Sequence, residues 1–547
     1  MSEPSEKLRW WRDAVLYQIY PRSFQDTNGD GVGDLPGITE RLDYLSRLGV
    51  DAIWISPFFL SPMEDFGYDV KDHRAVDPLF GKLEDFDELL NQAHQRNIRV
   101  LIDLVLNHSS NQHPWFRESR ATRDGPYADH YVWADPRPDG TFPNNWLSIF
   151  GGAAWTWEPQ REQYYLHNFL SSQPDLNFHH PAVRQEALDI ARWWLERGVD
   201  GFRLDTVNFY FHDTSLRDNP PADKADDQVV SLGNPYGLQT HLFDKNRPEV
   251  LSFLDAFGEL LAEYPGAMAL GEVGATEERA ISLMHAYTEP GRLHLCYTFD
   301  LLSHELTPSL FKKTIHKGQR EGRNLWRCLA FSNHDVERTA SRFGGPDAPA
   351  DKIAPLCMAL LLTLRGTPCI YQGEELGYSE SELPFEALVD PYGIAFWPAF
   401  KGRDGCRTPM AWSDKAPNAD FTKEDVPPWL PLDGAHRALN AATQEQREES
   451  MWRNTQRLLS LRKQEPALRG DNLEVMESAD PILAFMRGAE ESWLLCVFNL
   501  GKETERYPLP EHVEGYAHIA GDITLEQGEL GPLIKLDPWA WGVLRLS

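Results

Sequence analysis

Charged side chains follow several strongly apolar segments of this chain, at the points where each segment would end as a strand. In the stretch DGFRLDTVN, Arg203 and Asp205 stand two residues apart, so both side chains would point to the same side of an extended strand. Glu272 lies near the end of the apolar run AMALGEV, and the run RCLAFSNHD ends in His334 and Asp335. Carboxylates and a cation that meet at one edge would perturb each other's pKa values, as acid–base catalysis requires.

Each of these residues also has an ordinary structural explanation. A strand-end Asp often caps the following helix, and a lone His is often a hydrogen-bonded core residue. Three carboxylates on three separate strands are harder to explain in this way, because like-charge repulsion opposes bringing them together. One ionised and one protonated carboxylate are the equipment of glycoside hydrolysis. Arg203 would keep Asp205 ionised, and the apolar strand around Glu272 would raise its pKa toward the acid role, although spacing alone does not decide the assignment.

Eight apolar, β-rich segments recur along the chain, and most of them precede a helix-like segment such as 38–49 or 83–97. Apolar strands that alternate with amphipathic helices indicate a parallel sheet covered by helices. Eight such units predict a (β/α)8 barrel, whose reactive groups lie at the carboxyl ends of the strands. The eight segments are 15–21, 51–57, 98–108, 200–208, 267–273, 296–300, 327–335 and 368–375.

The predicted fold class is α/β: a (β/α)8 TIM barrel with an inserted domain after strand 3 and a C-terminal antiparallel β domain. Residues 1–103 and 178–470 are assigned to the barrel, and residues 104–177, rich in Trp, Asn, Pro and Gly, to the inserted domain. Residues 471–547 contain short strand-like runs and are assigned to a β-sandwich. A second long excursion, 377–436, follows the eighth strand.

Composition argues against several classes of partner. The 547 residues include 83 acidic and 53 basic side chains, for a net charge of −30, so a basic surface for nucleic acid or anionic lipid is not expected. No signal peptide and no membrane-spanning apolar run are recognised. The six cysteines lack metal-ligand and CxxC spacing. We therefore expect a cytoplasmic protein without nucleic-acid or membrane partners, as a monomer or homodimer.

The loop DTNGDGVGD carries a second chemical signal. Asp26, Asn28, Asp30 and Asp34 alternate with small residues in the ligand rhythm of an EF-hand loop, and Val32 could offer its backbone carbonyl. The bidentate Glu that completes an EF-hand loop is absent, and the preceding element is a strand rather than a helix. A true EF-hand is therefore not expected, and a polar turn is the alternative to a metal site.

Short motifs in this order resemble those of the α-amylase superfamily, glycoside hydrolase family 13. The similarity is closest to its bacterial α-glucosidase and oligo-1,6-glucosidase branch and covers nearly the whole chain. The motifs are DLVLNH (103–108), QPDLN (173–177), GFRLDTVN (201–208), GEV (271–273), FSNHD (331–335), YQGEELG (371–377) and GRDGCRTPM (402–410). By this resemblance, the inserted segment corresponds to the domain B of the family.

The resemblance implies a role for each residue that matches a motif. Asp205 resembles the nucleophile of a retaining double displacement, Glu272 the acid/base, and Asp335 the third carboxylate, which binds and distorts the sugar. The groups expected to bind the same glucose are His108, Arg203 and His334, the stacking aromatic Tyr68, and Asp65 paired with either Arg403 or Arg407. That last pair would grip the outer hydroxyls of the terminal sugar, which implies exo-action on short substrates.

Thr206 follows the expected nucleophile directly. Maltose-preferring members of this branch tend to carry Thr here and isomaltose-preferring members Val, so α-1,4 linkages are expected. The implied activity is a retaining exo-α-glucosidase that acts on maltose, sucrose or short oligosaccharides and transfers glucose to alcohol acceptors. An oligo-1,6-glucosidase and a sucrose isomerase or other glucosyltransferase remain alternatives. A non-catalytic scaffold subunit is disfavoured, because all three carboxylates are present and no anchor is recognised.

The resemblance also implies a structural Ca²⁺, or Mg²⁺, in the 26–34 loop, and no organic cofactor. The ion would brace the first loop after strand one and would not react. The polar segment 214–240, rich in Pro and Gly, is expected to border the acceptor side of the site.

Overall fold

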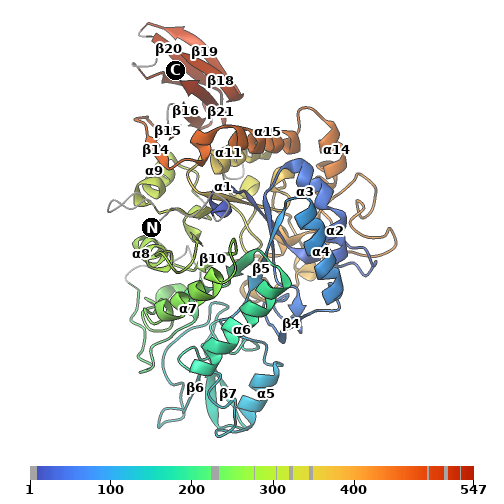
Figure 1. Ribbon diagram of the computed structural model, residues 1–547, viewed down its shortest axis with the longest axis vertical. Coiled ribbons are helices and arrows are strands. Elements are labelled where there is room, and N and C mark those ends of the chain that lie inside the picture. Colours follow the sequence, from blue (N-terminus) through green and yellow to red (C-terminus); the bar gives the residue numbers. More distant parts are fainter. Residues whose placement is uncertain are drawn as a thin grey trace.

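The centre of the molecule is a parallel sheet of eight strands that curls into a nearly closed barrel (Figure 1). The computed structural model describes residues 9–222, 233–275, 277–302, 305–318, 325–343, 349–489, 492–510, 515–529 and 531–546. The strands are β1 (Leu16–Ile19), β2 (Ala52–Ile55), β5 (Arg99–Leu104), β9 (Gly201–Leu204), β10 (Met268–Val273), β11 (Leu295–Thr298), β12 (Cys328–Leu329) and β13 (Thr367–Tyr371).

The sheet order confirms the predicted barrel. Hydrogen-bonded neighbours run β11-β10-β9-β5-β2-β1-β13-β12, every pair is parallel, and β11 and β12 at the two ends approach each other. Each strand overlaps one of the eight segments expected from the sequence. Side chains along each strand alternate between two cores, because successive residues of a strand point to opposite faces. Trp54, Leu101 and Leu270 fill the barrel interior, whereas Ile55 and Phe202 pack against the surrounding helices.

Helices cover the outside of the sheet. In α7, for example, buried residues recur at helical spacing, with Val250, Phe253, Leu254 and Phe257 on the face toward the strands. The covering helices are α2 (Leu35–Glu40), α3 (Leu42–Leu48), α4 (Leu83–Gln95), α6 (Pro181–Arg197), α7 (Val250–Ala262), α8 (Glu277–Tyr287), α9 (Pro308–Lys317), α10 (Thr339–Arg342), α11 (Ala350–Thr363), α15 (Met451–Gln464) and α16 (Pro466–Arg469). Short additional helices are α1 (Trp10–Asp13), α12 (Pro391–Phe396), α13 (Gly434–Ala438) and α14 (Ala441–Gln446).

The chain leaves the barrel after β5 and returns at α6, as predicted for an inserted domain (Figure 1, lower part). This part holds a small antiparallel sheet with its own core around Trp146 and Trp155. Its elements are α5 (Pro114–Ala121), β6 (Trp133–Ala134), β7 (Trp155–Glu158) and β8 (Gln163–Leu166). A separate hairpin, β3 (Phe59–Leu60) with β4 (Asp72–Val76), follows β2, and the loop between its strands contains Asp65 and Tyr68.

Two antiparallel sheets form the C-terminal part (Figure 1, top). They share a core that includes Leu495 from one sheet and Ile534 from the other, which is the packing of a β-sandwich. The five-stranded sheet contains β14 (Asn472–Val475), β15 (Ile482–Ala489), β16 (Ser492–Asn499), β21 (Trp541–Leu546) and β18 (Tyr516–Gly521), and the three-stranded sheet β17 (Glu505–Pro508), β20 (Gly531–Leu536) and β19 (Ile523–Gly528). The domain bounds expected from the sequence stay predictions.

All six cysteines are buried and unpaired. Within the described residues, no helix is both long enough and apolar enough to cross a membrane.

Candidate active site

The register of the central strands brings the expected charged residues to one end of the barrel. Arg203 on β9 lies opposite Asp103 on β5 and Leu270 on β10, and Glu272 lies opposite Tyr297 on β11. Because side chains alternate along a strand, these positions all face the barrel interior while their neighbours face the helices. Arg203 and Asp205 do point to the same side, since their side chains are in direct contact.

Arg203 is the hub of the buried charges. Its Nη1 donates to Asp103 Oδ1 (2.8 Å) and to Asp205 Oδ1. Its Nη2 lies 2.7 Å from Glu272 Oε2 and donates to the Tyr297 hydroxyl at 2.9 Å. None of these five residues is more than 4% exposed. One cation therefore serves three carboxylates, which leaves a local excess of negative charge when all three are ionised.

This excess of negative charge favours the protonated form of one carboxyl in the cluster. Burial raises the pKa of Glu272 from its ordinary value of 4.5 to about 7; contact with Arg203 opposes the shift, and the charges of Asp205 and Asp335 add to it. Burial also raises the pKa of Asp205 from 3.8 to about 7 and that of Asp103 to about 6, while Arg203 opposes both shifts. Once one carboxyl of the cluster is protonated, its repulsion of the others disappears and they ionise more readily. The cluster formed by Glu272, Asp205 and Asp103 therefore keeps a proton near neutral pH, as an acid catalyst requires.

Thr206 connects the two candidate catalytic carboxylates. Its backbone N–H donates to Glu272 Oε2 (3.0 Å), and its hydroxyl donates to Asp205 Oδ2 (3.2 Å). The residue has φ 40° and ψ 44°, a left-handed conformation that a β-branched side chain rarely adopts. The backbone is thus strained directly after Asp205, and the strained turn aims the amide at Glu272.

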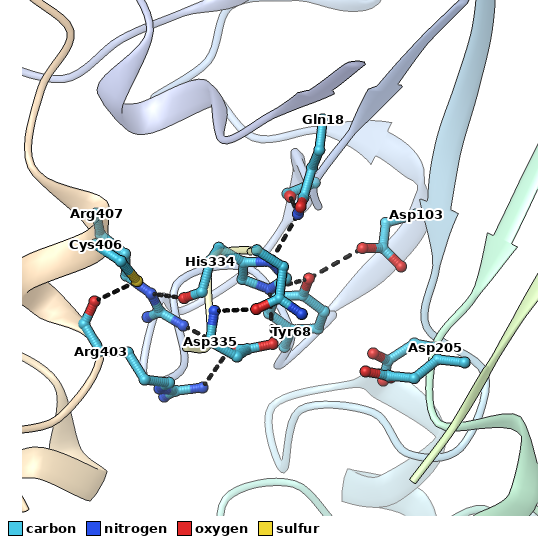
Figure 2. A network of polar contacts seen from close by, with 12 residues as sticks. Gln18, Tyr68, Asp103, Asp205, His334, Asp335, Arg403, Cys406 and Arg407 are labelled. Carbon is cyan, nitrogen blue, oxygen red and sulfur yellow. Dashed lines mark hydrogen bonds and ion pairs between the residues drawn. The ribbon is translucent and has the colours of Figure 1, made fainter. Parts of the chain in front are cut away.

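A second group of side chains continues from Asp103 (Figure 2). The Tyr68 hydroxyl donates to Asp103 Oδ2 (3.0 Å) and lies 2.6 Å from His334 Nε2, with its ring parallel to the imidazole at 5.3 Å. Burial lowers the pKa of His334 to about 3, so the ring is neutral. Gln18 Nε2 donates to its Nδ1 (2.7 Å), which leaves Nε2 to donate to Tyr68. His108 Nε2 lies 3.1 Å from the Tyr68 carbonyl oxygen.

Asp335 is the most open of the expected carboxylates, with a side chain that is 32% exposed. Arg407 Nη2 donates to its Oδ1 at 2.9 Å, and Arg403 Nη1 lies 3.3 Å from the same oxygen. Burial opposes the ionisation of Asp335, but the guanidinium groups of Arg403 and Arg407 outweigh it and hold the pKa of Asp335 below its ordinary range. Asp335 is therefore ionised, and it lies between the two arginines and Tyr68 (Figure 2).

The two candidate arginines have different partners. Arg403 Nη2 donates to Asp65 Oδ1 (2.9 Å), whereas Arg407 Nε donates to the His334 carbonyl oxygen (2.6 Å). Arg403 is held in turn by Asp390, which accepts hydrogen bonds from its backbone N–H, its Nε and its Nη2 (2.7 Å). Arg403 is thus the arginine that pairs with Asp65, a question the sequence left open.

All eleven residues expected to take part in catalysis or sugar binding are brought to this one rim, from Asp65 on the β3–β4 loop to Arg407 on the excursion after β13. Further members were not expected, among them Asp103, Tyr297, Asp390 and the two glutamines that bond to His334 and Asp65, Gln18 and Gln173. Asp103 stood in a quoted motif, and a carboxylate in a buried strand is itself a signal. Tyrosine is common in strands, so Tyr297 gave no signal, and neither did Asp390 in its loop.

The loop expected to bind a metal lies apart from this network. Among the described residues, no group of three or more His, Cys, Asp or Glu side chains is placed to hold a metal ion. Asp26 accepts hydrogen bonds from two loop amides, Asp30 from the Asn28 side chain and one loop amide, and Asp34 from the Thr27 and Gly37 amides. The Lys423 ammonium donates to the Asn28 carbonyl oxygen (2.8 Å). This arrangement does not fit the ion, which stays a prediction from the sequence.

Part of the segment 214–240, namely 223–232, lies outside the described residues. On one side of it, Asn145 contacts Asp218 and Asn219. On the other side, Asn234 donates to the Ile149 carbonyl oxygen and to the Tyr392 hydroxyl. Its predicted place at the acceptor side stays a prediction.

Comparison with known proteins agrees with this geometry. Residues 18–471 match the family described as Alpha amylase, catalytic domain. A probable alpha-glucosidase of Rhizobium meliloti (strain 1021) is 50% identical, over 98% of this chain and 97% of that protein. An oligo-1,6-glucosidase of Parageobacillus thermoglucosidasius is 35% identical, over 98% and 99% of the two chains.

Solved structures extend the likeness to the fold. The crystal structure of an alpha-glucosyl transfer enzyme, XgtA, is 51% identical with a TM-score of 0.93, over 98% of this chain and 100% of that one. A trehalulose synthase is 34% identical with a TM-score of 0.88, with the same coverage. With the barrel, the carboxylate cluster and these matches in agreement, the chain belongs to the α-amylase family of glycoside hydrolases, family 13.

Proposed function

We propose that the protein is a retaining α-glucosidase that releases glucose from the non-reducing end of short α-glucosides, preferentially α-1,4-linked ones such as maltose. The observation that carries this proposal is the binding of Asp205 and Glu272 to the two terminal nitrogens of one guanidinium, that of Arg203. Carboxylates held in this way lie close together. Closeness favours the separation of about 5–5.5 Å used by retaining enzymes over the roughly 6.5–9.5 Å of inverting ones.

In the first half of the reaction, Asp205 attacks the anomeric carbon while Glu272 gives its proton to the departing glycosidic oxygen. The carbon–oxygen bond to the leaving sugar breaks as a glucosyl ester with Asp205 forms. Burial raises the pKa of both Glu272 and Asp205 to about 7, while Arg203 lowers both, so the cluster keeps a proton up to about neutral pH. The proposal places that proton on Glu272 and leaves Asp205 ionised, as the resemblance to the family implies.

In the second half, Glu272 is ionised and takes a proton from a water molecule that attacks the same carbon. The ester bond breaks, Asp205 leaves as a carboxylate, and glucose departs with its original anomeric configuration. An alcohol that replaces the water gives a new glucoside, so transglucosylation needs no additional residue. XgtA, described as an alpha-glucosyl transfer enzyme, supports this extension.

Exo-action is inferred from the pair formed by Arg403 and Asp65. Arg403 and Asp65 are each at least 92% buried and pair with one another, with Asp390 behind the arginine. Such a pair offers charged hydrogen-bond partners to the outer hydroxyls of one sugar and closes the space beyond it. A chain could then enter only by its end.

Linkage preference rests on Thr206, whose hydroxyl donates to Asp205 and whose backbone N–H donates to Glu272, the residue proposed to protonate the leaving sugar. Two alternative activities come from the names of relatives. The oligo-1,6-glucosidase suggests cleavage of α-1,6 linkages, and the trehalulose synthase suggests rearrangement of sucrose.

Initial glucose release from maltose and isomaltose tests the proposal. Proton NMR of an aryl α-glucoside, which yields only one glucose per cleavage, identifies the first anomer formed. We expect faster release from maltose, α-glucose as the first product, and no release above background by Asp205→Asn. Faster release from isomaltose would replace the linkage assignment, and conversion of sucrose to an isomer without net hydrolysis would favour the isomerase. β-Glucose as the first product would refute the retaining mechanism.

A further inference from the structure

The Tyr297 hydroxyl sits between the hub cation and the candidate acid. It accepts a hydrogen bond from Arg203 Nη2 (2.9 Å) and donates to Glu272 Oε1 (3.1 Å). The side chain is 2% exposed and lies on β11, opposite Glu272 in the register of β10 and β11. Its ring packs near Trp54 inside the barrel, with centroids 6.2 Å apart, so the hydroxyl position is set by the strand and by the core.

The donors around Glu272 are distributed unequally between its two oxygens. A carboxylate offers about four lone-pair positions, two on each oxygen. Oε2 accepts a hydrogen bond from the Thr206 backbone N–H and forms an ion pair with Arg203 Nη2 at 2.7 Å, whereas Oε1 accepts a hydrogen bond from the Tyr297 hydroxyl. Neither group on the Oε2 side can accept a proton, because a guanidinium and a backbone amide nitrogen carry no available lone pair. A proton on Oε2 would therefore clash with fixed donors.

We propose that Tyr297 is a positioning residue which, with Thr206 and the charge of Arg203, orients the Glu272 carboxyl so that the acid proton lies on the second lone pair of Oε1. Tyr297 keeps the carboxyl from turning about its last bond, so this lone pair has one direction. As a donor to Oε1, the hydroxyl also stabilises the ionised form that acts as the base in the second half of the reaction. The inference rests on the proposed α-glucosidase activity.

Tyr297→Phe removes the hydroxyl and keeps the ring. Loss of a donor to a buried carboxylate should raise the pKa of Glu272 further, by about one unit. We expect the basic limb of the kcat/KM profile on maltose to move up by about one pH unit. Formation of the glucosyl ester from an activated aryl glucoside, whose leaving group needs little protonation, should be nearly unaffected. Breakdown of the ester should slow, because the base is held less well in its ionised form.

Tyr287→Phe is the matched control. Among the described residues the Tyr287 hydroxyl has no hydrogen-bond partner, and its ring is 1% exposed on α8, outside the site. Both variants lose one buried hydroxyl, so an effect of hydroxyl loss that is not specific to Glu272 would leave both pH profiles as in the wild type. That result would overturn the proposal for Tyr297.

A second readout does not depend on turnover. Infrared difference spectra of the wild type against Glu272→Gln isolate the C=O stretch of the protonated Glu272 carboxyl, whose loss with rising pH reports its titration. We expect this titration to move to higher pH in Tyr297→Phe, and to lower pH when 3-fluorotyrosine, a stronger donor, is incorporated at position 297. An unchanged titration in both proteins would refute the inference. If the wild type fails to cleave any glucoside, the proposed function falls, and the infrared titration still decides the role of Tyr297.

Discussion

Removal of the charge of Glu272 should make the protein more stable at alkaline pH. Glu272 is 4% exposed and shares Arg203 with two other carboxylates, so its ionised form is costly in the folded state. Glu272→Gln keeps the shape of the side chain. Its amide oxygen can accept from the Thr206 N–H, as Oε2 does, and can lie against the Arg203 guanidinium. The variant should therefore fold in the same way and differ chiefly in having no proton to lose.

The sign and size of the effect follow from linkage. Burial raises the pKa of Glu272 from 4.5 to about 7, so the folded protein binds this proton more tightly than the unfolded chain does. Stability then falls as the pH rises from about 4.5 through about 7, and the loss is complete above that range. A shift of about 2.5 units corresponds to about 3 kcal/mol. With an unfolding entropy of about 2.1 cal/mol/K per residue over about 400 barrel residues, the expected change in melting temperature is about 3–4 °C.

Differential scanning calorimetry of both proteins between pH 5 and pH 8 measures this difference. The melting temperature of Glu272→Gln relative to the wild type should rise by about 3–4 °C across that range. A hydrogen-bond mismatch of the amide is the same at each pH, so it cancels in the comparison. Glu424→Gln, on an exposed loop, is the matched control and should show no such trend. A pH-independent difference for Glu272→Gln would refute the shared-cation account of the acid.

Three other predictions concern linkage, the closed end of the pocket and the metal. Thr206→Val should lower the ratio of kcat/KM for maltose over isomaltose by roughly tenfold, the value of one hydrogen bond; an unchanged ratio would remove Thr206 from the account of specificity. Arg403→Lys loses the fork that binds Asp65 and leaves that buried carboxylate poorly paired, so kcat/KM for maltose should fall about a hundredfold. Kinetics equal to the wild type would exclude the pair from sugar binding. Because the carboxylates of the 26–34 loop are already hydrogen-bonded, added Ca²⁺ should not raise the melting temperature; a concentration-dependent rise that Asp30→Ala abolishes would establish the ion.

The barrel was predictable because its strands are buried on both faces. Such strands are continuous apolar runs, and a charged residue within one stands out, as Arg203 does in GFRL. The C-terminal strands were predicted only in part. β15, β16 and β21 carry most of the sandwich core, whereas β18 and β19 have mainly exposed or half-buried side chains and so lack an apolar pattern to detect.

The site was predictable only to the extent that each residue carried its own signal. Charged residues at strand ends identified Asp205 and Glu272. The pairing of Arg403 with Asp65 joins residues 338 positions apart, and only the packing of the excursion against the β3–β4 loop brings them together. In the 26–34 loop a clear sequence pattern was present but did not identify one structure. An alternation of Asp and Asn with glycine suits a hydrogen-bonded turn as well as a metal site.

Asp103 links the two halves of the site, although no step of the proposed reaction uses it. One of its oxygens shares the Nη1 of Arg203 with Asp205, and the other accepts from Tyr68, which continues to His334 and the ionised Asp335. Without Asp103, Arg203 would face two carboxylates instead of three, and the repulsion that helps keep a proton in the cluster near neutral pH would weaken. The acid role of Glu272 is therefore a property of the whole charge cluster, and a carboxylate two strands away in the sheet order is part of its cause.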